Sequence, residues 1–453
     1  MVKLDLLIIG GGTAGEYAMG TAKQSLDSVG MIEKGPIGGD CIFHACIPTK
    51  AMVHAARAYK KMRSAGFYGL PPLGKTADYK AVKAFKDRIV SGIGTGRDER
   101  WVKSGVRLFR GTARFASPHE VTVDDEVVRA DKIIIATGSM PAIPPIPGLK
   151  ETGYITNIEA LDLQHVPARL AIIGGGPIGV EFAQVFAAFG SKVNIYEALD
   201  RILIGEDEEI SQAMLGFFSK QGISVSTSVM VNQLQSTGSG KVVLAKGANG
   251  QDESAEYDEI LVATGRKPAV DGLDLAAAGV ETGKKGVTVD ASLQTNVPHI
   301  WAAGDVTGTF LFTFVAGEQG KTAALNATSN KRAELNYDVL PRATFCDPEV
   351  ASVGLTERQA LEQGYKVSTG KFDYANLTRA IVSDETDGFI KIVAEEGSGR
   401  ILGGHIVGVE ASSLIHEVAA AMAGGMTVAD IGTTLHAYPT LSEGVRYACQ
   451  AII

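Results

Sequence analysis

Two cysteines lie close together near the N-terminus, in the segment CIFHACIPTK that runs from Cys41 to Lys50. Thiols at this spacing can form a redox-active pair, a metal site or a structural bridge. A structural bridge is disfavoured because closing so short a loop restricts the unfolded chain little. Structural zinc usually needs a second pair of ligands at short spacing, whereas Cys346 and Cys449 stand alone in the sequence. We therefore predict no metal site and favour a redox pair at the start of a helix, where the backbone amides stabilise a thiolate.

A second pattern, rich in glycine, occurs twice. Asp5–Gly15 reads DLLIIGGGTAG, and Leu170–Gly179 reads LAIIGGGPIG. Each copy is an apolar run that enters G-x-G-x-x-G, followed by a helix of small residues and a strand that ends in an acid, Glu33 or Glu197. The acid lies near the ~20-residue offset that is typical of dinucleotide-binding β-α-β units. The sequence therefore predicts two such units.

Prolines and a repeated ATG segment mark the limits of these units. The proline-rich segment PAIPPIP follows the strand IIIATG, and ILVATGRKP ends the second unit as IIIATGSMP ends the first. Beyond Pro341, strand-like runs alternate with a helix of small residues. These elements predict an α/β protein with two Rossmann-like domains and a C-terminal α+β domain.

Charge and hydropathy narrow the class of protein further. The chain has 43 Lys and Arg against 51 Asp and Glu, a net charge of −8 with both signs scattered. We therefore expect no nucleic acid and no anionic membrane as a partner. No run reaches the ~18 apolar residues of a membrane span, and the N-terminus is a poor signal peptide. We expect a cytoplasmic protein.

The segment GGDCIFHACIPTK resembles the GG-x-C-x4-C-x-P-[ST]-K motif of the class I pyridine nucleotide-disulfide oxidoreductases. This flavoprotein family includes dihydrolipoamide dehydrogenase, glutathione reductase and mercuric reductase. The resemblance covers the whole chain in order, through both fingerprints, both ATG segments, IWAAGDV and the C-terminal segment. It implies a glutathione reductase-like fold and a homodimer whose active sites are shared between subunits. The domains that it implies are 1–148 for FAD, 149–268 for NAD, 269–340 as a central domain completing the FAD site, and 341–453 for dimerisation.

The resemblance assigns FAD to the first fingerprint and NAD(H) to the second. Glu33 would bind the adenosine ribose, and Asp305 a ribityl hydroxyl, although Asp305 could instead be a plain turn residue. Glu197 would accept from a free ribose 2′-hydroxyl and repel a 2′-phosphate, which favours NAD(H) over NADP(H). The expected cofactor-binding residues are Gly10, Gly12, Gly15, Glu33, Lys50, Thr137, Gly138, Gly174, Gly176, Gly179, Glu197, Gly265, Gly304 and Asp305.

The same resemblance assigns roles to the residues of the redox centre. Cys41 would be the interchange thiol that attacks substrate, and Cys46 the thiol that faces the flavin. Lys50 would form an ion pair with Glu181 beside the flavin, where a cation favours the anionic reduced ring. A solvated helix lysine is the alternative for Lys50.

The C-terminal segment departs from the family pattern at the catalytic position. The family signature H-P-T-x-x-E supplies a histidine base and a glutamate that orients it, whereas this chain reads HAYPTLSE from His436 to Glu443, with Tyr438 in place of the base. A phenol with a pKa near 10 is a poor base at neutral pH. Either Tyr438 is a tolerated change and His436 or His44 handles the proton, or the substrate is not an ordinary dithiol. The choice among Tyr438, His436 and His44 stays open.

The resemblance implies an NAD(H):disulfide or dithiol oxidoreductase that is closest to dihydrolipoamide dehydrogenase and passes electrons between NAD(H), FAD and the Cys41–Cys46 disulfide. Its substrate could be a lipoyl group on a carrier protein. A mercuric reductase-like enzyme, or another NADH-dependent flavin reductase that does not act on lipoyl groups, is the alternative because mercuric reductase also carries a tyrosine at the position of Tyr438. A second alternative is a flavin-bearing subunit with little thiol turnover. Intact Cys41, Cys46, Lys50 and Glu181 argue against that last reading.

Overall fold

The computed structural model describes residues 2–71, 76–247, 250–329 and 331–453, and the chain forms two compact units. Unit 1 comprises Met1–Ala51, Lys83–Ala142 and Gly265–Leu335. Unit 2 comprises Met52–Val82, Ile143–Thr264 and Asn336–Ile453. Each unit is therefore assembled from three separate stretches of the sequence.

Unit 1 is built on a seven-stranded sheet in the order β3-β2-β1-β6-β5-β4, with β18 paired to β6. Strands β1, β2, β3, β6 and β18 are parallel, and β4 and β5 form an antiparallel extension. Their bounds are β1 Val2–Ile9, β2 Val29–Glu33, β3 Arg107–Arg110, β4 Ala113–Ser117, β5 Glu120–Val123, β6 Glu126–Ile135 and β18 Ile300–Ala302. The apolar run of β1 is almost wholly buried, as expected for a central parallel strand.

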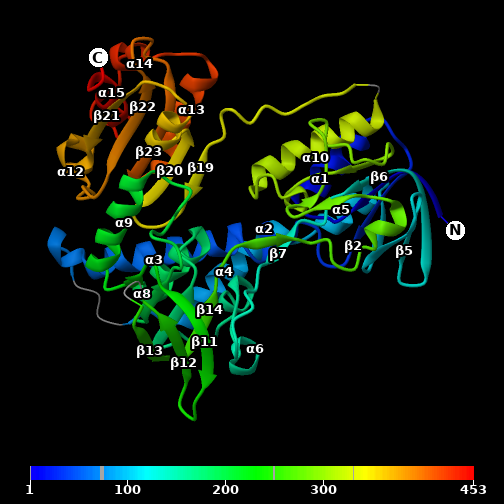
Figure 1. The fold of residues 1–453 in the computed structure, drawn as a ribbon, viewed down its shortest axis with the longest axis horizontal. Coiled ribbons are helices and arrows are strands. Elements are labelled where there is room, and N and C mark those ends of the chain that lie inside the picture. Colours follow the sequence, from blue (N-terminus) through cyan, green and yellow to red (C-terminus); the bar gives the residue numbers. More distant parts are fainter. Residues whose placement is uncertain (1, 72–75, 248–249, 330) are drawn as a thin grey trace. The chain divides into compact units, whose positions relative to one another are not determined.

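Two long helices of unit 1, α1 (Thr13–Ala22) and α10 (Thr313–Thr328), pack side by side (Figure 1). Gly320 permits the close approach, because a Cβ there would lie 2.1 Å from the carbonyl oxygen of Ala14. The other elements within this unit are α2 Gly39–Phe43, α5 Arg97–Lys103, β7 Ser139–Pro141, β15 Arg266–Pro268, η2 Leu275–Ala278, β16 Thr282–Gly283, β17 Gly286–Val287 and η3 Asp305–Thr307. Two helices, α3 (Cys46–Arg63) and α4 (Tyr79–Gly94), contribute residues to both units.

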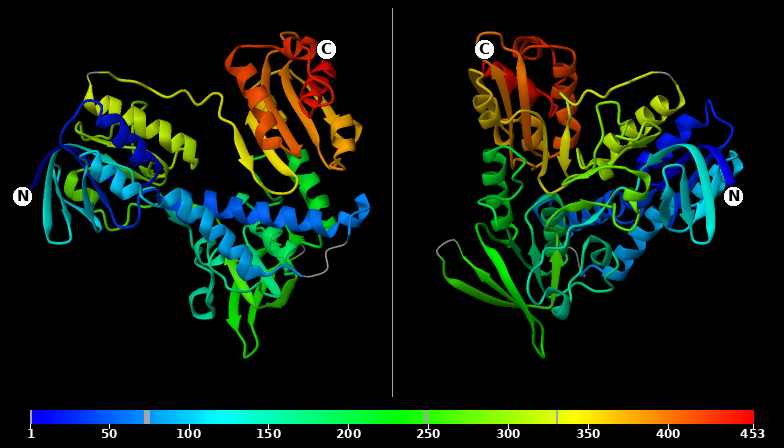
Figure 2. Two further views of the ribbon diagram at one scale, coloured as in Figure 1. Left: turned by 180° about the vertical axis from the view of Figure 1, so that it is seen from behind. Right: turned by 45° about the vertical axis from the view of Figure 1, so that its right-hand side comes forward.

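Unit 2 contains a second parallel sheet in the order β10-β9-β8-β14. Its strands are β8 Arg169–Ile173, β9 Lys192–Tyr196, β10 Ser224–Ser226 and β14 Glu259–Val262, and its main helices are α8 Pro177–Ala188 and α9 Glu208–Lys220. A separate antiparallel sheet, green in Figure 2, joins β11 Met230–Ser236, β12 Lys241–Lys246 and β13 Asp252–Tyr257. The short elements η1 Ala65–Tyr68, α6 Leu149–Thr152 and α7 Asn157–Ala160 complete this part.

The C-terminal part of unit 2 is a five-stranded antiparallel sheet in the order β19-β20-β23-β22-β21. Its strands are β19 Arg342–Thr344, β20 Glu349–Gly354, β21 Val367–Asp373, β22 Phe389–Glu395 and β23 Ile401–Gly408. Helix α13 (Ala411–Ala423) packs on β20 and β23, and α15 (Glu443–Gln450) packs on β21 and β22. The remaining elements are α11 Glu357–Glu362, η4 Tyr374–Asn376, α12 Thr378–Val382 and α14 Val428–Thr433.

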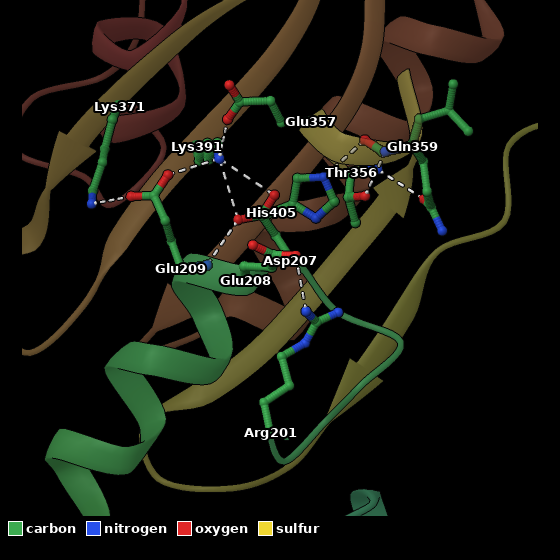
Figure 3. Close-up of polar contacts among 11 residues, drawn as sticks. Arg201, Asp207, Glu208, Glu209, Thr356, Glu357, Gln359, Lys371, Lys391 and His405 are labelled. Atoms are coloured by element: carbon green, nitrogen blue, oxygen red, sulfur yellow. Dashed lines mark hydrogen bonds and ion pairs between the residues drawn. The ribbon is translucent and has the colours of Figure 1, made fainter. Parts of the chain in front are cut away.

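A buried lysine joins this sheet to helix α9 inside unit 2. Lys391 Nζ lies 2.7 Å from Glu209 Oε1, 2.7 Å from Glu357 Oε2 and 3.2 Å from Asp207 Oδ1 (Figure 3). Burial alone would lower the pKa of Lys391, but its hydrogen bonds to the carboxylates outweigh burial and raise it. The lysine therefore stays charged between its carboxylates, and this arrangement holds the start of α9 against the sheet.

The predicted fold class is confirmed: two parallel Rossmann-like sheets are combined with an antiparallel α+β part. The boundaries at 148, 268 and 340 remain a prediction. No helix among the described residues combines the length and apolarity needed to cross a membrane.

Candidate active site

The predicted redox cysteines lie together in unit 1. Cys41 is in α2, Cys46 is the first residue of α3, and both are half-buried thiols joined by a hydrogen bond. The Cys46 Sγ atom also lies 3.3 Å from Oγ1 of Thr313, which opens α10. The hydrogen bond to Cys46 and burial raise the pKa of Cys41. Cys46 and burial thus both favour the protonated form of Cys41.

Beside the cysteines, the Asp40 carboxylate contacts a histidine and an arginine. Its Oδ1 lies 3.3 Å from His44 Nδ1, and its Oδ2 accepts a hydrogen bond from Arg266 Nη2. Burial raises the pKa of Asp40, but the contacts with His44 and Arg266 outweigh burial and bring it below its usual value. Asp40 is thus an ionised bridge between the histidine and the arginine.

Arg266 continues this network to Asp305. Its Nε donates to Ser139 Oγ over 2.7 Å, and that hydroxyl donates to Asp305 Oδ2 over 2.6 Å. Burial raises the pKa of Asp305 above its usual value, although Ser139 works in the opposite direction. Gly304, before Asp305, donates its backbone N–H to Gln319 Oε1 over 2.7 Å, which fixes the turn to α10.

The first glycine-rich turn joins β1 to α1 as predicted. A Cβ on Gly15 would meet the carbonyl oxygen of Gly10 at 1.9 Å, so the close crossing of helix and strand requires glycine. The Glu33 carboxylate accepts from the N–H groups of Gly11 and Gly35, each over 2.6 Å. A Cβ on Gly12 would meet nothing within 4 Å, which leaves room at the N-terminus of α1. An anion fits such a position.

The second turn, between β8 and α8 in unit 2, repeats this geometry closely. A Cβ on Gly179 would lie 2.0 Å from the carbonyl oxygen of Gly174, and one on Gly176 would meet nothing within 4 Å. The Glu197 carboxylate accepts from Gly175 N over 2.7 Å and from Leu199 N over 2.8 Å. Both acids therefore lie against the turn that a dinucleotide would occupy.

Lys50 and Glu181 belong to different units. Lys50 lies on α3, and its charge acts on Cys41 to lower the pKa of that thiol, against the larger contributions of Cys46 and burial. Glu181 is buried on α8 and accepts from Phe345 N over 2.8 Å. The ion pair between Lys50 and Glu181 remains a prediction.

Among the C-terminal candidates, only Tyr438 presents most of its surface to solvent, being 71% exposed. Glu443 is buried and accepts from Tyr447 Oη and from Thr440 N, each over 3.1 Å. The carboxylate expected to orient a base is thus engaged at the start of α15. His436 has its own partners: Nε2 lies 2.8 Å from Glu417 Oε1, and Nδ1 lies 3.0 Å from the carbonyl oxygen of Thr434.

Comparison with known proteins agrees with this geometry. The family described as "Pyridine nucleotide-disulphide oxidoreductase" matches residues 4–323, and its dimerisation domain matches residues 340–449. The chain belongs to this family. The predicted resemblance is confirmed.

Among curated relatives of the family, the mercuric reductase of Staphylococcus aureus is 36% identical over 449 residues, which cover 98% of this chain and 81% of that one. The dihydrolipoyl dehydrogenase of Bacillus subtilis is 35% identical over 457 residues and covers 99% of both chains. Among solved structures, the Cu(II) complex of the HOCl-induced flavoprotein disulfide reductase RclA from Escherichia coli has a TM-score of 0.89 at 28% identity. That match covers 100% of both chains.

Family membership confirms FAD and a nicotinamide cofactor, and the two glycine turns fit them. Pyridine nucleotide-disulphide oxidoreductases couple a nicotinamide to a disulfide through FAD, which supplies the electron-accepting ring. The first turn with Glu33 would hold the FAD pyrophosphate and ribose, and the second turn with Glu197 would hold the nicotinamide cofactor. The matched dimerisation domain indicates a homodimer.

Four residues of this oxidoreductase site were not singled out from the sequence: Asp40, Ser139, Arg266 and Thr313. Asp40 lies in the motif GGDC and Arg266 in the motif ATGRKP, but no sequence pattern links the two residues. Thr313 carries no sequence signal, since it comes from a helix far along the chain from the cysteines.

Proposed function

We propose that this protein is an FAD-dependent NAD(H):disulfide or dithiol oxidoreductase of the dihydrolipoamide dehydrogenase type. Electrons would pass between NAD(H), FAD and the Cys41–Cys46 pair. The observation that carries the proposal is the hydrogen-bonded thiol pair with Thr313 at Cys46, in the same unit as the first dinucleotide turn. Cys41 would exchange with substrate, and Cys46 would serve the flavin.

Residues 1–148 would form the FAD domain, 149–268 the NAD domain, 269–340 the central domain and 341–453 the dimer interface. Lys50 and Glu181 would stabilise charge at the flavin. The active site would be shared between the two subunits, and the substrate would be a small disulfide or a lipoyl group on a carrier protein.

Reduction of Hg(II) is the second candidate, which the relatives named mercuric reductase favour. A soft metal ion needs thiolates, and the distribution of thiols limits where they could come from. Cys346 and Cys449 are fully buried, and burial raises the pKa of both, that of Cys449 to about 12. Among the described residues, Cys41 and Cys46 are therefore the thiols that could meet the ion.

A substrate panel tests the proposal with the purified holoenzyme. NADH consumption would be followed with lipoamide, glutathione disulfide, Hg(II) and a quinone, for the unaltered protein and for Cys41→Ser. We expect lipoamide to be reduced and the Cys41→Ser variant to lose that activity. Faster turnover of Hg(II) than of any disulfide would favour the second candidate. Bleaching of the flavin by NADH without turnover of either would indicate a flavin-bearing subunit.

A further inference from the structure

Oxidation of a dithiol requires a group that accepts the proton of the substrate thiol, and the C-terminal segment does not supply an ordinary one. Few phenols are ionised at neutral pH, because their usual pKa is near 10, so Tyr438 is a weak acceptor. His436 has both ring nitrogens in hydrogen bonds, to Glu417 and to the carbonyl of Thr434. The surroundings of the cysteine pair offer another histidine.

We propose that Asp40 and His44 form the acid–base pair that moves the proton of the substrate thiol at Cys41. This inference rests on the proposed function. It assigns a catalytic role to His44 and a positioning role to Asp40, at two positions inside the cysteine motif itself.

The backbone places the three side chains within one turn. His44 N donates to the carbonyl oxygen of Asp40 over 2.8 Å, so residues 40–44 are helical up to the histidine. Cys41 and His44 are three positions apart in this turn, so the backbone keeps the two residues near each other, with Asp40 directly before Cys41. The His44 side chain is 43% exposed and Cys41 is half-buried, so both are open enough to meet a substrate.

Asp40 determines which nitrogen of His44 acts as the base. Its carboxylate lies 3.3 Å from Nδ1 and accepts the hydrogen on that atom, which leaves the lone pair on Nε2 as the basic position. Arg266 anchors the second oxygen of the same carboxylate and is itself held by Ser139. An aspartate fixed in this way orients an imidazole and stabilises its protonated form.

Charges of both signs surround His44. Asp40 favours a positive ring, as does a thiolate at Cys41 or Cys46. Arg266 and Lys50 oppose it, since Arg266 contacts Asp40 and the charge of Lys50 reaches Cys41. Asp305 is connected to Arg266 through the hydroxyl of Ser139. General acid–base catalysis requires a group that both takes up and releases a proton.

The exchange balances with His44 as the carrier of one proton. His44 Nε2 takes the proton of one substrate thiol while that sulfur bonds to Cys41 Sγ, the Cys41–Cys46 bond breaks, and Cys46 leaves as a thiolate. The second substrate sulfur then bonds to the first, releasing its proton to water, and Cys41 leaves and recovers the proton from His44. The substrate has lost two electrons and two protons, and the cysteine pair has gained the two electrons.

The test measures two half-reactions of the anaerobic holoenzyme by stopped flow between pH 5.5 and 9.5. One is the reduction of the cysteine pair by dihydrolipoamide, and the other is reduction by NADH. For His44→Asn we expect the ratio of the dithiol rate to the NADH rate to fall roughly 10²-fold at pH 7, the usual contribution of a positioned base. The deficit should shrink toward pH 9.5 as the substrate thiols ionise, and added imidazole should partly restore the rate of His44→Ala.

Two further variants complete the test. Asp40→Asn should lower the ratio by about tenfold and shift the midpoint of the pH profile, because the ring loses its orienting charge. His54→Asn, the same change at an exposed histidine of α3, is the matched control and should leave the ratio unchanged.

The result that overturns the inference is a His44→Asn enzyme whose ratio and pH profile match those of the unaltered protein. An unaltered enzyme whose dithiol rate rises in proportion to thiol ionisation from pH 6 to 9 would also overturn it, whether or not the variants fold. Failure of the proposed function looks different: NADH would reduce the unaltered enzyme, but dithiols would not.

Discussion

His436 and Glu417 form a hydrogen-bonded pair inside unit 2, with 2.8 Å between Nε2 of the imidazole and Oε1 of the carboxylate. The histidine side chain is almost buried, and its other nitrogen faces the carbonyl oxygen of Thr434. Each nitrogen is therefore occupied by an acceptor of the same chain. This arrangement suits a residue that holds the loop before Tyr438 in place.

We accordingly predict that His436→Gln destabilises the protein without changing the acid–base chemistry. Loss of the pair leaves Glu417 without its partner, which costs about 1–3 kcal/mol when a hydrogen-bonded group is partly buried. The melting temperature should fall, while the pH profile of dithiol oxidation keeps its shape. If the pH dependence of dithiol oxidation disappeared while the melting temperature stayed unchanged, His436 would instead be the base.

The two redox cysteines should differ sharply when replaced singly. If Cys46 is the thiol that serves the flavin, Cys41→Ser would leave it as a thiolate beside that ring, so we expect a permanent long-wavelength absorbance band and no disulfide turnover. Cys46→Ser should show neither the band nor turnover. Absorbance spectra and NADH:lipoamide assays check both. A Cys41→Ser enzyme with full turnover would reverse the assigned roles.

Glu197 should make NADH the preferred cofactor over NADPH. Its carboxylate lies at the turn after β8, where it would repel a 2′-phosphate. Glu197→Arg removes that repulsion and adds a cation suited to phosphate, so the preference in kcat/KM should narrow or reverse. Glu197→Gln, which removes the charge alone, separates the two effects. Equal use of both cofactors by the unaltered enzyme would contradict the assignment.

His405 should make the protein less stable as the pH falls below about 6.5. Burial lowers the pKa of His405 below its ordinary value, and its Nε2 lies 2.9 Å from the carbonyl oxygen of Leu355. The folded protein keeps this ring neutral, whereas the unfolded chain takes up a proton, so stability is present above the unfolded pKa and is lost as the pH falls. Asp207 and Glu206 favour the charged ring, and Arg342 opposes it.

Between pH 7.5 and 5.5 this effect amounts to up to about 1.4 kcal/mol, the free energy of one pKa unit. His405→Gln removes the titrating group, so its melting temperature should depend less on pH than that of the unaltered protein. His54→Gln, at an exposed position, should behave like the unaltered protein. Parallel curves for His405→Gln and the unaltered protein would show that His405 does not contribute.

Short-range patterns in the sequence were enough to predict the local elements of this protein. Two β-α-β units were predicted from Gly10, Gly15 and Glu33 and from their counterparts in the second copy. In each copy a tight turn, a close helix crossing and a terminal acid occur within one short segment. The spacing of Cys41 and Cys46 likewise identified the redox motif. Fold class, family and cofactors followed from such local patterns and were confirmed.

The side chains that complete the site come from distant parts of the chain and meet through folding. Arg266 reaches Asp40 across 226 positions of the sequence, and Thr313 reaches Cys46 across 267. No periodicity or local spacing encodes such contacts, because they arise from the packing of strands and helices whose order in space differs from their order in the chain. The same packing joined His436 to Glu417. Asp40 and His44, only four positions apart, meet through a local helical turn, and the distant Arg266 is what tertiary packing adds to them.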